Sequence, residues 1–360
     1  MTRIGSDAIP PSIEGAYEVG GELPLTFSPR GDTPRSRDVG RLCQALKDEA
    51  DWVRAALTRH GALRFRGFDV EDAYDFERIA RAVDDDLKRD YLGTSPRDAV
   101  SDYVFNASEL PDFYPIPQHC EMSFCASPPR RVFFSCLVEP AAGGGETPLC
   151  DFRKVWADLD SDVRERFEQK GLRHVRNYAA PGAEESADPT QLKPWPDMFA
   201  TTDHAVVEDK SRAEGFEPVW VDGDGLRLIS TQPVMRAHPA TGEPVWHNHL
   251  TTFHRTTAEA ELRRVAEYRP TERQKGLARM AAGLAERLAQ TPSEELGMHT
   301  THLDGSEIDA ADVEHVRDVI WRHMVIEPWK LGDVVAIDNH STSHGRLPYE
   351  GDRTVVVCWA

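Results

Sequence analysis

Two short strings, far apart in the chain, contain residue types that bind transition metals. The first is His119-Cys120-Glu121 and the second is His344-Gly345-Arg346. In an extended strand, residues two apart point to the same face, so His119 and Glu121 are expected to project together while Cys120 points away. One ion can take all three side chains only if the first and last β-rich segments meet. The strings therefore predict that these segments belong to one barrel.

The chemistry of this set is specific. Two imidazoles and one carboxylate on one face of an iron ion leave three coordination positions open. Those positions can take a bidentate co-substrate and dioxygen. A three-residue pattern such as H-x-E also arises by chance in long proteins, so the surrounding sequence has to support the hypothesis.

Apolar periodicity predicts β structure toward both ends of the chain and helices between. Helices are expected from Val39 to just before Gly61, over 76–87, over 262–290 with a break near Arg269-Pro270, and over 310–323. Expected strands cover 62–68, 131–138, 324–329, 332–339 and 353–359. This order predicts a mainly β fold with helical insertions around a β-sandwich or jelly-roll core.

The chain is expected to form one large domain. Residues 1–37 are rich in Pro, Gly, Ser and Arg and are predicted to form an irregular N-terminal arm. The domain then extends over 38–360. Within it, residues 179–215 are polar and interrupted by proline, which predicts an irregular insertion or lid over a site.

Charge and composition exclude several classes of function. The net charge of −19 would repel a phosphate backbone, so nucleic acid is not expected as a partner. No secretory signal and no run of about 18 apolar residues is visible, so no membrane association is expected. The six cysteines lack C-x-x-C spacing and are predicted to be buried thiols of a reducing cytoplasm.

Further residues suit the binding of a carboxylate beside a metal. Thr147 follows three glycines in the string GGGETPL and can donate its hydroxyl to a carboxylate. Arg353 begins an expected strand, from which its guanidinium can form a bidentate pair with a ligand carboxylate inside a barrel. Asp338-Asn339 and Gly345-Arg346 lie on either side of His344 and are expected to orient its imidazole.

Six strings in a fixed order resemble one known family, the TauD/TfdA superfamily of Fe(II)/2-oxoglutarate dioxygenases. The resemblance is to its SyrP-like branch, near clavaminate synthase and the arginine hydroxylases, and spans about residues 38–360. The strings are PQHCEMSF (117–124), PPRRVFFSC (128–136), GGGETPL (143–149), HPATGEPVWHNH (238–249), WKLGDVVAIDN (329–339) and HGRLPYEGDR (344–353).

The resemblance implies a double-stranded β-helix fold and assigns roles by position. His119, Glu121 and His344 would bind Fe(II), and Thr147 and Arg353 would hold the distal carboxylate of 2-oxoglutarate, with O₂ as the other co-substrate. The chain departs from the family pattern at Cys120, where a polar residue is expected, and at Trp246-His247-Asn248-His249, where relatives usually show Phe and Gln.

The activity implied is hydroxylation of a C–H bond in a small molecule of a natural-product pathway. An amino-acid-like substrate, free or tethered to a carrier protein, is the family-level expectation. Candidate substrate contacts are Asn177, His247, Asn248 and His249. The presence of Glu121 favours oxygenation over halogenation, because related halogenases lack this carboxylate. The sequence leaves the oligomeric state open.

Three alternatives remain open at this point. The cluster of His247, His249 and His254 offers three imidazoles that could bind zinc in a hydrolase. A jelly roll could also serve as a non-catalytic binding protein. Within the oxygenase class, desaturation or ring formation could replace hydroxylation.

Overall fold

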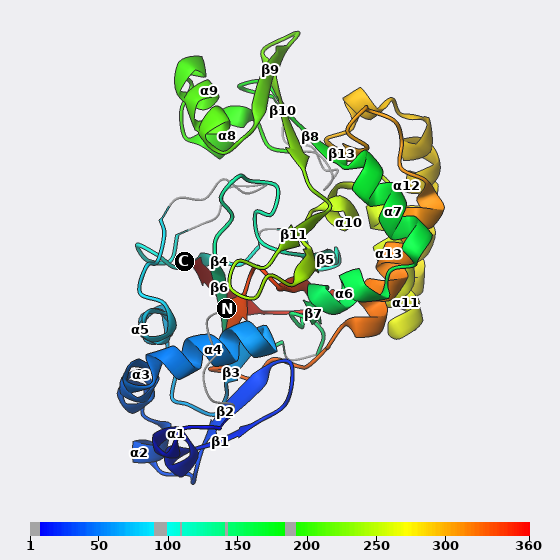
Figure 1. The fold of residues 1–360 in the computed structure, drawn as a ribbon. Coiled ribbons are helices and arrows are strands. Elements are labelled where there is room, and N and C mark those ends of the chain that lie inside the picture. The colour runs from blue at the N-terminus through cyan, green and yellow to red at the C-terminus, as the bar shows by residue number, and fades with distance from the viewer. Residues whose placement is uncertain (1–7, 90–98, 109, 141–142, 184–191) are drawn as a thin grey trace.

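A seven-stranded sheet built from both ends of the chain runs from the middle of the molecule, near β4 and β6, to its lower edge at β1 and β2 in Figure 1. The computed structural model describes residues 8–89, 99–108, 110–140, 143–183 and 192–360. Only the β2–β3 pair is parallel among the paired neighbours of this sheet. The strands in spatial order are β1 (Tyr17–Gly20), β2 (Leu25–Pro29), β3 (Ala62–Phe65), β14 (Val334–Asp338), β6 (Arg131–Val138), β16 (Thr354–Trp359) and β4 (Phe105–Asn106).

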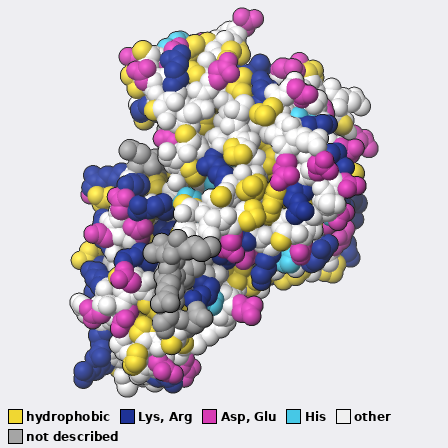
Figure 2. Space-filling view, in the orientation of Figure 1, with side chains coloured by type: hydrophobic (Ala, Val, Ile, Leu, Met, Phe, Trp, Pro, Cys, Tyr) yellow, Lys and Arg dark blue, Asp and Glu magenta, His cyan; other side chains and the backbone are white. Residues whose placement is uncertain are grey.

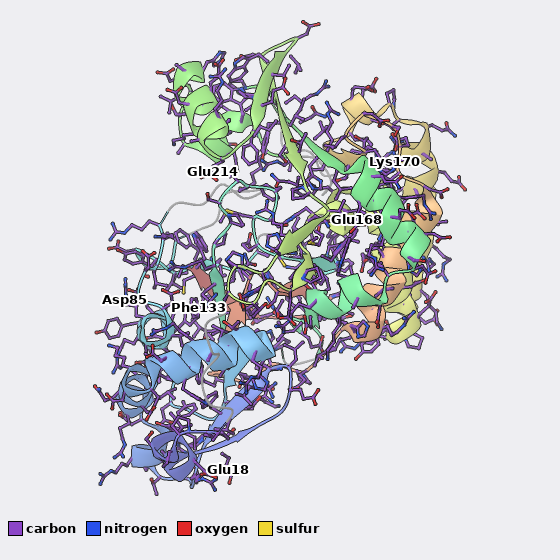
Figure 3. All side chains as sticks on the ribbon, in the orientation of Figure 1. Glu18, Asp85, Phe133, Glu168, Lys170 and Glu214 are labelled. Carbon is purple, nitrogen blue, oxygen red and sulfur yellow. The ribbon has the colours of Figure 1, made fainter. Side chains whose placement is uncertain are left out.

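N-terminal helices cover the outer face of this sheet. Phe27, Phe65 and Phe133 from the strands and Leu46 and Phe76 from the helices share one buried apolar cluster. Figure 3 places Phe133 inside the molecule, with Glu18 at its edge. The helices are α1 (Pro11–Ala16), α2 (Pro34–Arg37), α3 (Val39–Asp48), α4 (Ala50–His60) and α5 (Ala73–Val83).

A three-stranded sheet packs against the inner face of the large one. Its strands in order are β5 (Ile116–His119), β15 (Thr342–Arg346) and β7 (Leu149–Asp151). The rings of Phe134 on β6 and His344 on β15 have centroids 4.9 Å apart, so the two inner faces are in contact. The outer face of the small sheet packs on α6 (Phe152–Asp158), α7 (Ser161–Lys170) and α13 (Ala310–His323).

The middle of the chain supplies further strands and helices. A four-stranded sheet has the order β13 (Met298–Thr301), β8 (Leu172–Tyr178), β10 (Gly225–Gln232) and β9 (Glu217–Val221). A hairpin pairs β11 (Met235–Ala237) with β12 (Pro244–Trp246). The helices are α8 (Trp195–Phe199), α9 (His204–Ala213), α10 (Leu250–Phe253), α11 (Thr257–Tyr268), α12 (Glu272–Gln290) and the 3₁₀ turn Ser293–Glu295. Figure 1 shows α8, α9 and β9 projecting from the rest.

Several sequence predictions are confirmed in position. Strand β6 and helix α13 have the predicted bounds, and the break between α11 and α12 falls at Arg269-Pro270. Gly61 ends α4 with φ 76°, as a C-cap glycine does. The single helix expected after Val39 is two helices, because the chain bends at Glu49. The strand β15, which carries His344, and the four-stranded middle sheet were not predicted.

Two expectations about irregular segments are wrong. The described part of the N-terminal arm contains α1, β1, β2 and α2, and β2 pairs with β3 over Leu25–Phe27. The first strands therefore belong to the main sheet. The expected lid at 179–215 includes helices α8 and α9, whose Trp195, Phe199 and Val207 join the inner apolar cluster. Residues 1–7 of the arm and 184–191 of the lid lie outside the described residues.

The fold class is confirmed in its coarse form. Sheets of mixed pairing enclose the core and helices cover them, although helices contain more of the described residues than strands do, so "mainly β" is wrong. The described strands do not close into a barrel.

All six cysteines are buried and free of disulfides, as predicted. In the part of the chain described, no helix combines the length and apolarity needed to span a bilayer. Acidic and basic side chains are interspersed on the face in Figure 2.

Candidate metal centre

The structure brings His119, Glu121 and His344 together between the two sheets. One ligand-capable atom from each lies within 4.8 Å of the others. His119 and His344 are direct partners in the register of β5 and β15, and their ring centroids are 4.5 Å apart. Nε2 of His344 lies 3.4 Å from Oε2 of Glu121. All three are buried, with 8%, 3% and 4% exposure for His119, Glu121 and His344.

The side-chain directions predicted for the H-x-E string required a fully extended strand, but the string is extended only as far as His119. Strand β5 ends at His119, and Glu121 begins a turn in which Met122 has φ 51°. This turn directs the carboxylate back toward the two imidazoles. Cys120 does point away, since it packs in the apolar cluster on the far side of the small sheet. Burial raises the pKa of its thiol well above the usual value.

A hydrogen bond within the strand end orients the first imidazole. Nδ1 of His119 lies 2.9 Å from the carbonyl oxygen of Pro117, which can only accept, so Nδ1 carries the proton. The lone pair is then on Nε2, the arrangement that second-shell carbonyls impose on metal-bound histidines. The donor set, the burial and this tautomer fit Fe(II) bound by two imidazoles and one carboxylate.

Asn339 holds the backbone of Glu121 with both ends of its amide. Its Oδ1 accepts from the Glu121 N–H at 2.7 Å, and its Nδ2 donates to the carbonyls of Glu121 at 2.9 Å and Pro129 at 2.8 Å. The sequence predicted that Asn339 orients the imidazole of His344. In the structure, the Asn339 side chain instead contacts the backbone of Glu121. Asp338 instead accepts from His238 at 2.8 Å and Arg131 at 3.2 Å. Arg346 donates to the carbonyls of residues 110, 111 and 114.

Replacing Asn339 by leucine is expected to lower Fe(II) affinity by about 10- to 100-fold, the usual loss when an outer partner of a metal ligand is removed. The substitution leaves one buried N–H and two buried carbonyls of the turn unsatisfied, at about 1–3 kcal/mol each. Anaerobic Fe(II) titration measures the effect. His340→Ala, at the next residue, is the matched control and should bind Fe(II) normally. Equal affinities in the two variants would contradict the role of Asn339.

Arg353 and Thr147 lie at the end of the same core. Nε of Arg353 donates to the carbonyl of Gly145 at 2.8 Å, two residues before Thr147. A Cβ at Gly145 would lie 2.7 Å from Cδ of Arg353, so only glycine allows this approach. Burial, followed by the charge of Arg346, lowers the pKa of Arg353 to about 10. Thr147 accepts from Trp329 Nε1 at 3.2 Å, which leaves its hydroxyl hydrogen to donate.

Arg353 is therefore a cation suited to an incoming anion. It remains charged at neutral pH, and among the described residues it forms no ion pair with a carboxylate. Its strand neighbours Val355 and Val357 belong to the inner cluster with Phe134. A carboxylate bound here would lie inside the two sheets, as the sequence predicted for one end of 2-oxoglutarate.

Of the four candidate substrate contacts, one lies against the metal site. The His249 ring is 5.1 Å from that of His119, and its Nδ1 is 2.6 Å from Oγ of Ser123. Oδ1 of Asn248 accepts from the backbone N–H of Leu250 and its Nδ2 donates to the carbonyl of Val234, each at 2.9 Å. His247 lies 3.2 Å from the carbonyl of Asn339. Asn177 bonds the 294 and 296 carbonyls and Arg227, on the outer side of β8.

The structure does not assemble the three imidazoles of the proposed zinc cluster. His249 contacts the triad, His247 neighbours His340, and His254 pairs with His299. Within the described residues, only two groups of metal-ligand side chains converge, and neither contains His247 or His249. Sequence spacing suggested this cluster, but α10 begins directly after His249 and turns His254 away.

Residues that the sequence analysis missed form the walls of the site. Phe124 lies edge-on to His249 with centroids 4.6 Å apart, and Phe253 lies 4.9 Å from His249. Phe134 contacts His344 from the facing sheet. Phe124 and Phe134 lie inside the matched strings, but only the packing of the sheets shows that their rings touch the imidazoles.

Buried histidines near the site make stability depend on pH. Burial lowers the pKa of His174 and of His247 to about 3. The unfolded chain takes up protons on these residues below about pH 6.5 while the folded chain does not, so stability is lost as the pH falls from 6.5 toward 3. We expect a loss of about 1.4 kcal/mol per pH unit for each histidine. Urea unfolding at several pH values measures this slope. His247→Asn should reduce it, and an unchanged slope would contradict the assignment; surface variant His323→Asn is the control.

Comparisons with known proteins identify related sequences and folds. A model of the family described as "Taurine catabolism dioxygenase TauD, TfdA family" matches residues 23–359. The dapdiamide synthesis protein DdaC of Enterobacter agglomerans is 28% identical over 301 residues, which cover 84% of this chain and 82% of that protein. A clavaminate synthase-like protein of Arabidopsis thaliana is 28% identical over 319 residues, with 87% and 85% covered. PvcB from Pseudomonas aeruginosa shares the fold, with a TM-score of 0.50, 14% identity and coverage of 94% and 85%.

Proposed function

Since the chain belongs to the TauD/TfdA family of non-haem Fe(II)- and 2-oxoglutarate-dependent dioxygenases, we propose that it hydroxylates a C–H bond of an amino-acid-like small molecule. The convergence of His119, Glu121 and His344 between two facing sheets carries this proposal. With iron bound, 2-oxoglutarate and O₂ supply the oxidising power, and succinate and CO₂ leave as co-products. We propose that the facing sheets form a double-stranded β-helix core, with residues 38–360 as the catalytic domain together with the first strands.

The proposed roles of the chain's own residues follow from their positions. His119, Glu121 and His344 hold the metal, and the carbonyl of Pro117 keeps the His119 proton on Nδ1. Arg353 and Thr147 grip the distal carboxylate of 2-oxoglutarate. The aromatic rings of Phe134, against His344, and of Phe124 and Phe253, against His249, exclude water, which strengthens charge interactions inside the site.

Glu121 supports oxygenation as the reaction class. Its carboxylate occupies the ligand position that chloride would need in a halogenase. Asn339 fixes the backbone on both sides of its Cα, so the carboxylate cannot readily leave. Hydroxylation therefore fits the site better than halogenation, while desaturation and ring formation have the same ligand requirement.

The substrate class rests on the relatives and on one histidine. One relative is named for the synthesis of dapdiamide and another for its likeness to clavaminate synthase, which supports a natural-product pathway. His249 and Ser123 offer a hydrogen-bonded polar pair beside His119. Burial lowers the pKa of His249 well below its usual value, so a neutral imidazole faces the substrate. The location of the protein in the cytoplasm stays a prediction.

The test is 2-oxoglutarate turnover with a panel of substrates. Purified protein, Fe(II) and 2-oxoglutarate are incubated with free amino acids and, in a second arm, with the same amino acids as carrier-protein thioesters. Succinate above the substrate-free rate and a product heavier by one oxygen atom are expected. A product lighter by two hydrogens would replace hydroxylation with desaturation or cyclisation. Absence of stimulated turnover across both arms would refute the amino-acid-like substrate.

His249→Phe separates substrate binding from cofactor binding. The variant keeps an aromatic ring against Phe124 and Phe253 but removes both ring nitrogens. We expect a higher KM for the substrate and an unchanged KM for 2-oxoglutarate. Equal KM values for substrate in the variant and the wild type would remove His249 from the substrate site.

A further inference from the structure

A second group of metal-ligand side chains lies outside the triad. His254, His299 and Glu307 each offer one ligand atom, and these atoms lie within 4.8 Å of one another. His254 directly follows α10, His299 lies on β13, and Glu307 lies in the loop before α13. The segment that follows α10 therefore meets the chain between β13 and α13, which is remote from it in sequence.

The two imidazoles are buried and the carboxylate opens to solvent. His254 and His299 are 5% and 1% exposed, and their ring centroids are 5.1 Å apart. Nε2 of His299 lies 2.9 Å from Oε2 of Glu307, whose side chain is half exposed. A separation near 3 Å between two donor atoms suits neighbouring ligands of one small ion, and an ion can enter past Glu307.

An unsatisfied nitrogen of His254 distinguishes this cluster from an ordinary ion pair. Its Nδ1 is 2.8 Å from Oγ1 of Thr256, but its Nε2 is buried without a hydrogen-bond partner. Such an atom costs about 1–3 kcal/mol unless something occupies it. A metal bond to Nε2 would supply that partner.

The surrounding charges bear on which ion fits. Arg317 pairs with Glu314 at 2.9 Å, whereas Arg255 donates to Oε1 of Glu307 itself at 3.0 Å and would share that carboxylate with the ion. Ser293 also donates to Glu307. With part of the carboxylate's charge already used, hard ions that need several oxygens are poorly served. Imidazole nitrogens suit zinc, and two histidines with one glutamate are a known zinc donor set with a fourth position open to water.

Metal binding requires the ring proton of each histidine to move. Nδ1 of His254 accepts from the backbone N–H of Thr256 at 3.4 Å, so binding through Nε2 moves its proton to Nδ1, where Oγ1 of Thr256 can accept it. Nδ1 of His299 accepts from the backbone N–H of Arg255 at 3.3 Å, so its proton is on Nε2, which donates to Glu307. Binding a metal through Nε2 moves this proton to Nδ1 and gives up the long contact with Arg255.

We propose that His254, His299 and Glu307 form a zinc site separate from the catalytic triad. Zinc would join α10 to β13 and to the loop at Glu307. Helix α10 also contacts the strand that ends at His119, through Thr251 Oγ1 and the carbonyl of Gln118 at 3.3 Å. The site would thereby restrain one wall of the catalytic centre.

The test uses full-length protein with the triad removed, because His119, Glu121 and His344 would bind the same ions. Metal-free His119→Ala/His344→Ala protein is titrated with Co²⁺, whose visible absorption reports tetrahedral coordination, and with Zn²⁺ by calorimetry. One equivalent is expected to bind. Adding His254→Ala or Glu307→Gln should weaken zinc binding by more than about 100-fold. Removing an outer partner of a ligand lowers metal affinity by about 10- to 100-fold, and removing one of three direct ligands should lower it further.

The matched control is His323→Ala. His323 also pairs with a carboxylate, with Nε2 2.7 Å from Oδ2 of Asp158, but no third ligand from the described residues converges there. This variant should retain full binding. Glu307→Gln changes a half-exposed side chain, so it decides the result if a histidine variant does not fold. The proposal is overturned if the triad-free protein binds no zinc, or if binding survives Glu307→Gln and His254→Ala unchanged.

Discussion

His344→Ala is expected to weaken Fe(II) binding by more than about 100-fold and to abolish succinate formation. The loss should exceed the 10- to 100-fold effect of removing an outer partner, because His344 is proposed as a direct ligand. Its ring lies between His119 and Phe134, with centroids 4.5 Å and 4.9 Å away. Anaerobic titration with Fe(II) and 2-oxoglutarate should show the visible charge-transfer absorption of the chelate in the wild type alone.

His340→Ala is the matched control for His344→Ala. His340 precedes the same strand, but it does not converge with His119 and Glu121. Burial lowers its pKa to about 4, so its removal takes away no charge at neutral pH. Thermal unfolding of both variants checks that the fold is kept. Normal turnover by folded His344→Ala would refute the triad and return attention to the other histidines.

Arg353→Gln should raise the KM for 2-oxoglutarate by roughly 30-fold to several thousandfold. Removing one partner of a buried, hydrogen-bonded charge pair costs about 2–5 kcal/mol, largely because the other charge is left unpaired. Arg353→Lys keeps the charge but loses the planar donor pair, so an intermediate KM is expected. Initial rates of succinate release at saturating substrate measure these values.

Fe(II) affinity should stay unchanged in Arg353→Gln, which separates this effect from loss of the metal. Arg54→Gln serves as the control, because Arg54 is an exposed arginine paired only with Asp51 in its own helix. Thr147→Val should show a smaller increase in the KM for 2-oxoglutarate, in proportion to the loss of one hydrogen bond. An unchanged KM in Arg353→Gln would mean that the co-substrate carboxylate binds elsewhere.

Local patterns predicted the elements whose faces are strongly periodic. Strand β6 and helices α11 to α13 were predicted at or near their bounds, because long amphipathic segments are specified by their own residues. Strand β15 escaped prediction because Thr342-Ser343-His344-Gly345-Arg346 has neither an alternating pattern nor β-branched residues beyond its first position. It is a strand because β5 and β7 pair with it on both sides.

The N-terminal arm shows the same dependence on partners. Its composition is that of a loop, but β2 gains backbone hydrogen bonds from β3, and Phe27 is buried between that sheet and α4. Cross-strand pairing and burial supply stability that the isolated segment lacks. The helices α8 and α9 likewise form where Trp195, Phe199 and Val207 find an apolar surface.

By itself, the sequence determined the family and named a candidate donor set: two histidines, a glutamate, a threonine and an arginine in strings whose order is distinctive. Ligand identity is a property of residue type, which the sequence states directly. Tertiary structure decided which polar groups act on which ligand. Asn339 holds Glu121 and not His344, His249 faces the triad, and His254 joins His299 and Glu307. Those contacts depend on strand pairing and chain direction between remote segments, which residue spacing does not encode.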